Sequence, residues 1–194
     1  MYSPNKPTRS FELPPIPDLS GWVVQFKYDG DRAIVHCDGN GHVHILSRHL
    51  RPLGTIAHRV VLGHWKWLSM LDIPRPWILD GELTPTERLI IWDTPLWGGE
   101  DWTTRTYADR LVLLQLTLKQ VQKGTTALEV IKTLPAKRYK ELLLRHDPDA
   151  EGLVFKSVTG KDFWGFKTRE VGSQIKYRFQ LEKTGEDNGD PDIA

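Results

Sequence analysis

Short runs of alternating apolar and polar residues predict a series of β-strands. The first three runs are rich in valine, isoleucine, phenylalanine and histidine, and turn residues separate them. Strands are expected at residues 22–27, 32–37, 42–47, 77–83, 88–93, 127–133, 152–157 and 174–179. The separator Asp-Gly-Asn-Gly at 38–41 is typical of a tight hairpin, because Asn and Gly accept the positive φ that such turns need. We therefore expect the first three strands to form an antiparallel meander.

Apolar residues at helical spacing predict three helices. Residues 55–71 show this spacing, and residues 107–122 place Leu111, Leu114 and Leu118 on one face. A third, shorter helix is expected at 138–145, before an Asp-Pro-Asp turn. Because helices fall between strands of the meander type, the element order predicts the α+β class, with antiparallel β-sheets flanked by helices.

Neither end of the chain carries a periodic pattern. Residues 1–20 hold five of the thirteen prolines, so we interpret them as a proline-rich arm lying over the fold. Residues 180–194 contain five acidic residues and one lysine, which favours a flexible acidic tail. The expected folded domain is therefore residues 21–179.

Composition narrows the class of protein. Hydrophobic residues make up 39% of the 194 positions, which is ordinary for a soluble globular domain. No apolar run approaches the ~18 residues of a membrane-spanning helix, so no membrane partner is expected. One cysteine, Cys37, excludes an internal disulfide and predicts a reducing, cytoplasmic location. With 26 basic against 25 acidic residues, a polyanion could bind only at a local basic patch.

The segment KYDGDR at 27–32 is the sharpest chemical signal. It places a lysine near the end of a strand, followed by a carboxylate, a glycine and an arginine. A lysine with an ordinary pKa of about 10.4 is neutral in only about one molecule in 2500 at pH 7. To act as a nucleophile, Lys27 therefore needs nearby cations or a metal, and Arg32, Lys156, Lys176 and Arg178 are candidates. Taken alone, Lys27 and Asp29 also fit an ordinary surface pair at a turn.

Five further segments follow in a fixed order: SRHLRPL at 47–53, LDGEL at 79–83, IWD at 91–93, EGLVFK at 151–156 and QIKYR at 174–178. Together with KYDGDR, they resemble the motifs of the nucleotidyltransferase (adenylation) domain of ATP-dependent DNA ligases. This family belongs to the covalent lysyl-nucleotide superfamily. The resemblance spans residues 27–178 and implies an ATP-grasp-like, ligase-type nucleotidyltransferase fold. It also implies ATP and Mg²⁺ as cofactors.

The resemblance assigns a nucleotide site. Lys27 would attack the α-phosphate of ATP and carry AMP, while Trp92, in place of the usual Phe or Tyr, would stack on adenine. The strand backbone near Phe26 would read the amino edge of the base, and Glu82 would accept the ribose hydroxyls. Lys156 would complete this nucleotide-binding set.

The same resemblance assigns the groups that act on phosphate. Lys176 and Arg178 would contact the α-phosphate, with Mg²⁺ held near Glu151. Arg32 and Arg48 would hold the 5′-phosphate of a nucleic acid strand. Asp29, beside the nucleophile, would position a metal or a hydroxyl group. The implied product is a sealed bond between a 5′-phosphate and a 3′-hydroxyl, with DNA favoured over RNA.

Two features of the sequence depart from the family pattern. An oligonucleotide-binding barrel normally follows the last motif, whereas here a short acidic tail follows Arg178, so we expect a domain without the barrel. Arg178 stands where lysine is usual, which keeps the charge but changes the geometry. Slow self-adenylation, use of a preadenylated strand and a partner protein in place of the barrel all stay open.

Three alternatives also stay open. An RNA ligase of the same superfamily fits the same motifs. A metal-dependent hydrolase would use the neighbouring histidines, which are His36, His42, His44 and His49, although alternating strands explain the same spacing. A catalytically silent nucleic-acid-binding remnant is the third, and the intact lysine motif argues against it.

Overall fold

The computed structural model describes residues 8–10, 19–54, 63, 73–122, 128–145, 147–160 and 174–179. Its strands are β1 (Thr8–Ser10), β2 (Trp22–Tyr28), β3 (Asp31–Cys37), β4 (Val43–Leu46), β5 (Trp77–Leu83), β6 (Leu89–Trp97), β7 (Glu100–Asp101), β8 (Leu128–Val130), β9 (Thr133–Pro135), β10 (Ala150–Ser157) and β11 (Gln174–Arg178). Its helices are α2 (Tyr107–Gln122), the 3-10 helix η1 (Ala136–Arg138) and α3 (Tyr139–Leu143).

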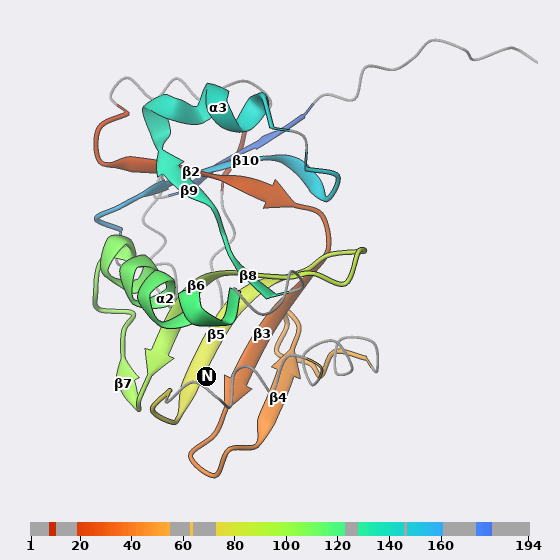
Figure 1. Cartoon of the computed structure of the whole chain (residues 1–194), viewed down its shortest axis with the longest axis vertical. Helices are drawn as coiled ribbons and strands as arrows, with labels where there is room; N and C mark the ends of the chain where they lie inside the picture. Colours follow the sequence, from red (N-terminus) through yellow and green to blue (C-terminus); the bar gives the residue numbers. More distant parts are fainter. Residues whose placement is uncertain are drawn as a thin grey trace, which may run out of the picture.

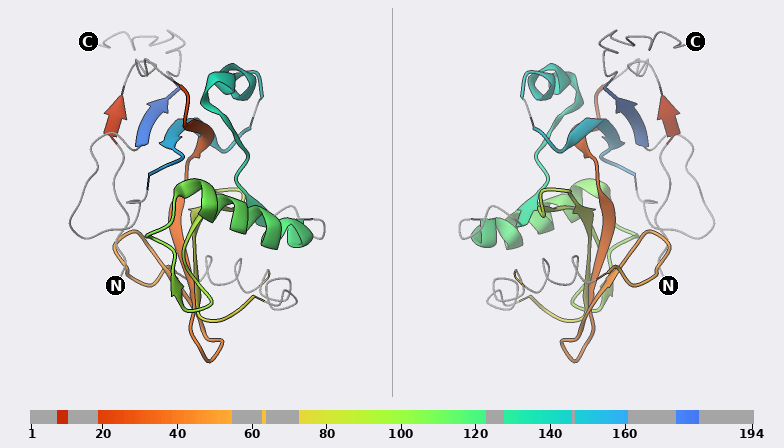
Figure 2. Two further views of the ribbon diagram at one scale, coloured as in Figure 1. Left: turned by 90° about the vertical axis from the view of Figure 1, so that its left-hand side faces the viewer. Right: turned by 90° about the vertical axis from the view of Figure 1, so that its right-hand side faces the viewer.

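Within these residues the strands form two sheets (Figure 1). The first sheet has the order β1-β11-β10-β2-β9, and the second has the order β4-β3-β5-β6-β7, with β8 paired to β6. Most pairs are antiparallel, while β1–β11 and β6–β8 are parallel. Figure 2 shows the first sheet above the second, and the chain crosses directly between them from β2 to β3. The expected α+β class with antiparallel sheets is confirmed.

The expected meander of three strands is wrong at its first link. β3 and β4 pair as predicted, but β2 lies in the other sheet, between β10 and β9. Both edges of β2 are thus taken by strands far along the chain. Gly30, in the two-residue link, packs so closely that a Cβ would lie 2.3 Å from the carbonyl oxygen of Leu83 on β5. The Asp-Gly link is therefore a crossing between sheets and not a hairpin.

The strand expected at residues 127–133 is two strands in two sheets. β8 extends the second sheet beside β6, and β9 extends the first sheet beside β2. This segment is the second connection between the sheets. The helix expected at 138–145 begins earlier, as η1, and ends at Leu143. Within the expected arm, Thr8–Ser10 pair in parallel with β11. The helix expected at 55–71, apart from Gly63, and the tail expected at 180–194 lie outside the described residues.

Apolar packing follows the predicted alternation. Val24, Phe26 and Tyr28 of β2 pack with Leu153 and Phe155 of β10 and with Leu142 of α3, in one cluster. The helix α2 packs along β6 and β8, where Leu114 and Leu118 join the core of the second sheet (Figure 1). No helix among the described residues is long and apolar enough to cross a membrane.

Candidate active site

Lys27 and Arg178 lie on the same face of the first sheet. Phe26 and Tyr28 point into the core beside α3, so the period of two puts Lys27 on the opposite face. Gly152 of β10 is paired with Lys27 on one side and with Arg178 of β11 on the other. Directly opposed residues of antiparallel strands share a face. The two cations therefore flank a residue that has no side chain.

Gly152 is required at this position by close backbone packing. A Cβ there would lie 1.9 Å from the carbonyl oxygen of Tyr177 and 2.9 Å from the Cα of Arg178. β10 has an irregularity in register between Ala150 and Gly152, at Glu151. The Glu151 carboxylate forms an ion pair with the Nζ of Lys27 and lies 3.3 Å from the Nε of Arg178. Glu151 thus bridges the two cations across the glycine.

The surroundings of Lys27 favour its neutral amine. Burial, together with the charges of Lys176 and Arg178, lowers the pKa of Lys27 to about 8, against the opposite effect of Glu82 and Asp29. Its side chain is 11% exposed. With a pKa of about 8, about one Lys27 in ten is neutral at pH 7. The amine is therefore far more available for attack than an ordinary surface lysine.

Glu82 of β5 approaches the site from the second sheet. Its pKa is raised to about 8, mainly by burial and also by Asp80. The cations Arg32, Lys27 and Lys176 act in the opposite direction. Near neutral pH the carboxyl group is therefore largely protonated, and it can both donate to and accept from hydroxyl groups. A Cβ at Gly30 would lie 3.1 Å from the Cγ of Glu82, so the tight crossing also packs against this side chain.

Trp92 and Arg32 share one carboxylate. Asp80, which is buried, accepts hydrogen bonds from the Nε of Arg32 at 2.8 Å and from the indole Nε1 of Trp92 at 2.8 Å. The Cζ of Arg32 lies 5.4 Å from the centre of the Trp92 ring. The structure therefore places Arg32, expected on a strand phosphate, against Asp80 and the aromatic ring. Asp80 fixes the orientation of Trp92.

Lys156 lies beneath this group. Its Nζ donates to the hydroxyl of Tyr107 at 3.2 Å and lies 5.6 Å from the centre of the Trp92 ring. Burial lowers the pKa of Lys156 to about 7, against the opposite pull of Asp93 and Asp80. Lys156 is thus a buried amine that joins β10 to the second sheet and to α2.

Gln25 is a polar residue of this face that the sequence analysis did not single out. Its Nε2 donates to the hydroxyl of Tyr107 at 2.6 Å and to Thr133 at 2.8 Å. Its carbonyl oxygen is buried and, within the described part of the chain, has no hydrogen-bond partner. The signal that could have found it is its place two residues before Lys27, on the same face of the same strand.

Three expected site residues have side chains that are buried in the core or exposed at the surface. The Phe26 side chain is in the core beside Tyr28, on the far face of β2 from Lys27. Asp29 is exposed, and its backbone N–H donates to the carbonyl oxygen of Asp149 at 2.8 Å. Arg48 is exposed in the turn after β4, where its Nε donates to the Nε2 of His49 at 2.9 Å.

The neighbouring histidines lie on or beside β3 and β4 of the second sheet. His36 and His44 face each other across β3 and β4, with ring centres 5.9 Å apart, while His42 pairs with Asp38. The described residues contain no group of three or more His, Cys, Asp or Glu side chains that could hold a metal ion. Mg²⁺ on a polyphosphate usually takes only one or two carboxylates and several waters, so Glu151 beside Lys27 fits such an ion.

The structure is similar to known ligase domains. The ligase domain of LigD from M. tuberculosis has a TM-score of 0.66 and 18% identity, over 91% of this chain and 59% of that one. The chain has the fold of these ligase domains. A mycobacterial DNA ligase D complexed with ATP has a TM-score of 0.64 and 19% identity, over 91% of this chain and 60% of that one. The ATP-dependent DNA ligase of bacteriophage T7, in complex with ATP, has a TM-score of 0.53 and 13% identity, over 88% of this chain and 67% of that one.

The expected ligase-type nucleotidyltransferase fold is thereby confirmed at the level of the fold. The chain spans about three fifths of the length of the two mycobacterial ligase chains. No protein-family model and no curated protein sequence matches it.

Proposed function

We propose that this chain is the catalytic part of an ATP-dependent polynucleotide ligase, in which Lys27 carries AMP. The observation that carries the proposal is the row of Lys27, Gly152 and Arg178, bridged by Glu151 on the ligase-type fold. This row gathers positive charge around an amine whose surroundings lower its pKa. The same face holds Lys176, which lies two register positions away from Arg178 on β11.

The first step transfers AMP to the enzyme. The neutral Nζ of Lys27 attacks the α-phosphorus, an N–P bond forms, and the P–O bond to pyrophosphate breaks. The nitrogen of the new N–P bond carries one extra proton, which passes to water. Lys176 and Arg178 neutralise charge on the α-phosphate, which is the main task of a protein in phosphoryl-type transfer. The Glu151 carboxylate must leave Lys27 and Arg178 when the phosphates arrive.

Glu151 is the residue that would hold Mg²⁺ at this site. When bound, the ion would neutralise charge on the phosphates. Glu151 now pairs with Lys27 and Arg178, and the phosphates would take its place beside these two cations. Its carboxylate would be the group that holds the ion once the phosphates have taken its place beside Lys27 and Arg178.

Two features support adenine as the base. Trp92, oriented by Asp80, offers an aromatic surface for stacking. The carbonyl of Gln25 can only accept a hydrogen bond, and its amide N–H groups are already used by Tyr107 and Thr133. Adenine presents an amino donor at the position where guanine presents an acceptor. Gln25 would therefore favour ATP over GTP.

Later steps would pass AMP to a 5′-phosphate and release it when a 3′-hydroxyl attacks. Arg48 is exposed and available to a strand phosphate, whereas Arg32 would first have to loosen its contact with Asp80. We propose nicked DNA as the substrate, with an RNA ligase as the alternative. Asp29, exposed at the end of the nucleophile strand, would position the incoming hydroxyl.

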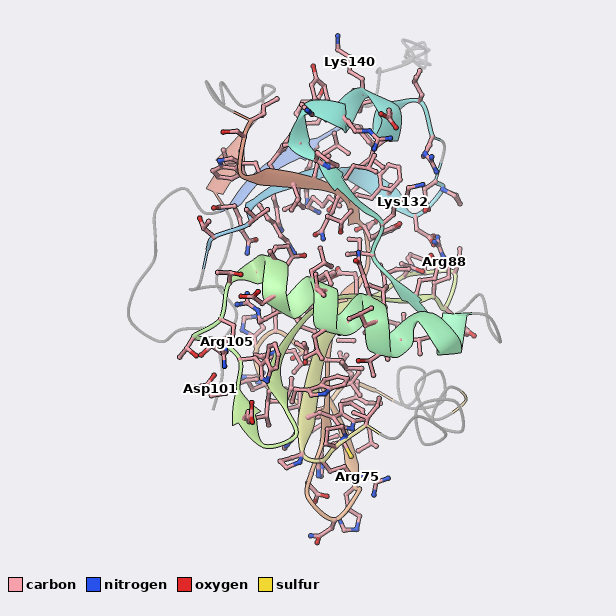
Figure 3. The ribbon with its side chains drawn as sticks, turned by 60° about the vertical axis from the view of Figure 1, so that its left-hand side comes forward. Arg75, Arg88, Asp101, Arg105, Lys132 and Lys140 are labelled. Atoms are coloured by element: carbon pink, nitrogen blue, oxygen red, sulfur yellow. The ribbon has the colours of Figure 1, made fainter. Side chains whose placement is uncertain are left out.

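The direct test incubates the protein with α-labelled ATP and Mg²⁺. Covalent label is expected on the wild type and absent from Lys27→Ala. Lys140→Ala, on the exposed surface of α3 (Figure 3), is the matched control and should label normally. Label that persists in Lys27→Ala would refute the proposal. Sealing of nicked DNA, nicked RNA and hybrids, each with and without a preadenylated 5′ end, then separates DNA ligase from RNA ligase.

A further inference from the structure

Arg88 joins three carboxylates from two distant parts of the chain. Its guanidinium contacts Glu129 of β8 through Nε and Nη2, both at 3.1 Å. Its Nη1 donates at 3.0 Å to Asp147 and to Asp149, in the loop before β10. Figure 3 shows Arg88 at the level between the first and the second sheet. We call Arg88, Glu129, Asp147 and Asp149 the Arg88 clasp.

The clasp also holds the turn that follows the nucleophile. The hydroxyl of Tyr28 donates to Asp147 at 3.2 Å, and the backbone N–H of Asp29 donates to the carbonyl oxygen of Asp149 at 2.8 Å. The Cζ of Arg88 lies 5.6 Å from the centre of the Tyr28 ring. Tyr28 and Asp29, the two residues that follow Lys27, are therefore both held by the loop that Arg88 contacts.

Three of the segments that meet at the clasp carry a residue of the candidate active site. Arg88 lies between Glu82 and Trp92, in the hairpin of β5 and β6. Asp149 lies two residues before Glu151, and Tyr28 directly follows Lys27. The distance between the nucleophile on the first sheet and the base and ribose residues on the second sheet thus depends on this contact.

We propose that Arg88 is a positioning residue for nucleotide transfer, which aligns Lys27 and Glu151 of the first sheet with Glu82 and Trp92 of the second. This inference rests on the proposed function. Arg88 supplies one positive charge to three carboxylates, so its removal leaves Glu129, Asp147 and Asp149 close together and repelling one another. The loop at 147–149 would then move, and the turn after Lys27 would move with it.

The test compares Arg88→Met and Arg88→Lys with Arg138→Met, which removes an exposed pair with Glu141 on the far helix. In single-turnover labelling at saturating ATP, Arg88→Met should be at least about tenfold slower, while the ATP concentration for half-maximal rate changes less than about twofold. Arg88→Lys should fall between, because lysine keeps the charge and loses the forked geometry. Arg138→Met should label as the wild type does.

A role in stability alone gives a different pattern. In that case Arg88→Met melts at a lower temperature, but its folded molecules label at the wild-type maximal rate, and the inference is overturned. Should Arg88→Met not fold, Asp149→Asn removes one charge of the clasp and keeps the side-chain shape. It should slow maximal labelling by about threefold or more, and an unchanged rate would overturn the inference.

Hydrogen exchange separates this inference from the proposed function. The Asp29 amide should exchange faster in Arg88→Met or Asp149→Asn than in the wild type, because its acceptor is the Asp149 carbonyl. Unchanged exchange contradicts the clasp even if labelling is normal. If the wild type takes no label while exchange responds as expected, the proposed function fails and the clasp stands as a structural contact only, so its role in positioning fails as well.

Discussion

The Lys27 row and the Arg88 clasp are both built from ion pairs, and their charge balance is opposite. Around Lys27, the Glu151 carboxylate bridges Lys27 and Arg178, and Lys176 adds a third positive charge that acts on Lys27. In the clasp, one guanidinium meets three carboxylates. A surplus of cations leaves positive charge for an anionic ligand to neutralise. A surplus of carboxylates around one arginine holds chain segments together and leaves no positive charge to bind a phosphate.

The largest effect is expected from Gly152→Ala, which breaks the Lys27 row at its centre. Its Cβ has no room beside Tyr177 and Arg178, so β10 and β11 must separate and the two cations must shift. Labelling should fall by about a hundredfold or more, the loss typical of a misplaced reacting group. The matched control is Gly39→Ala, whose Cβ meets nothing within 4 Å. Equal labelling of Gly152→Ala and Gly39→Ala would contradict the role of the row.

A tenfold effect is expected from Arg178→Met. Removing this cation takes one donor from the α-phosphate, and charge-assisted contacts of this kind contribute about 1.5–3 kcal/mol. The maximal labelling rate should fall by about tenfold or more, and pyrophosphate should inhibit the variant less than the wild type. Arg138→Met, which removes a cation outside both clusters, should change neither quantity.

The pH dependence of labelling should report Lys27. The attacking form is the neutral amine, so the rate should rise with pH and level off above the pKa of about 8. Arg178→Met should move this midpoint upward, because one of the charges that lower the Lys27 pKa is gone. A rate that stays constant between about pH 6 and about pH 9 would show that the amine does not limit the reaction.

The smallest effect concerns the clasp in acid. Burial raises the pKa of Asp147, but hydrogen bonds from Arg88 and from the Asp149 backbone hold it below its ordinary value. A carboxyl group with a lowered folded-state pKa stabilises the fold above its unfolded pKa and loses this contribution as pH falls through the folded one. Asp147→Asn should therefore melt below the wild type at neutral pH. The difference should shrink in acid titrations followed by circular dichroism as the pH falls through the lowered pKa of Asp147 in the folded state.

The sequence predicted most strands well, because a half-buried strand shows its two faces as alternation. It predicted the local pairing of β3 with β4, but it could not predict the pairing of strands that are far apart in the chain. The Asp29-Gly30 link looks like a hairpin turn, and only β10, more than a hundred residues later, shows that β2 belongs to another sheet. The Thr133 strand likewise joins β2 across a long separation.

The candidate site divides in the same way. Lys27, Glu82 and Glu151 stood out as motif residues, and the structure brings them together with Lys176 and Arg178. Arg88 did not stand out, because its partners lie 41 to 61 residues away and its chemistry depends wholly on them. Gln25 was missed for a similar reason, since Tyr107 and Thr133 come from elements far along the chain.

The most direct measurement is mass spectrometry of the protein after incubation with ATP and Mg²⁺, with the modified residue mapped by peptide. One AMP per chain, attached through an acid-labile bond to Lys27, is the expected result. AMP on the buried Lys156 or on a surface lysine, or no adduct at any pH where Lys27 is neutral, would contradict the central role given to the Lys27 row.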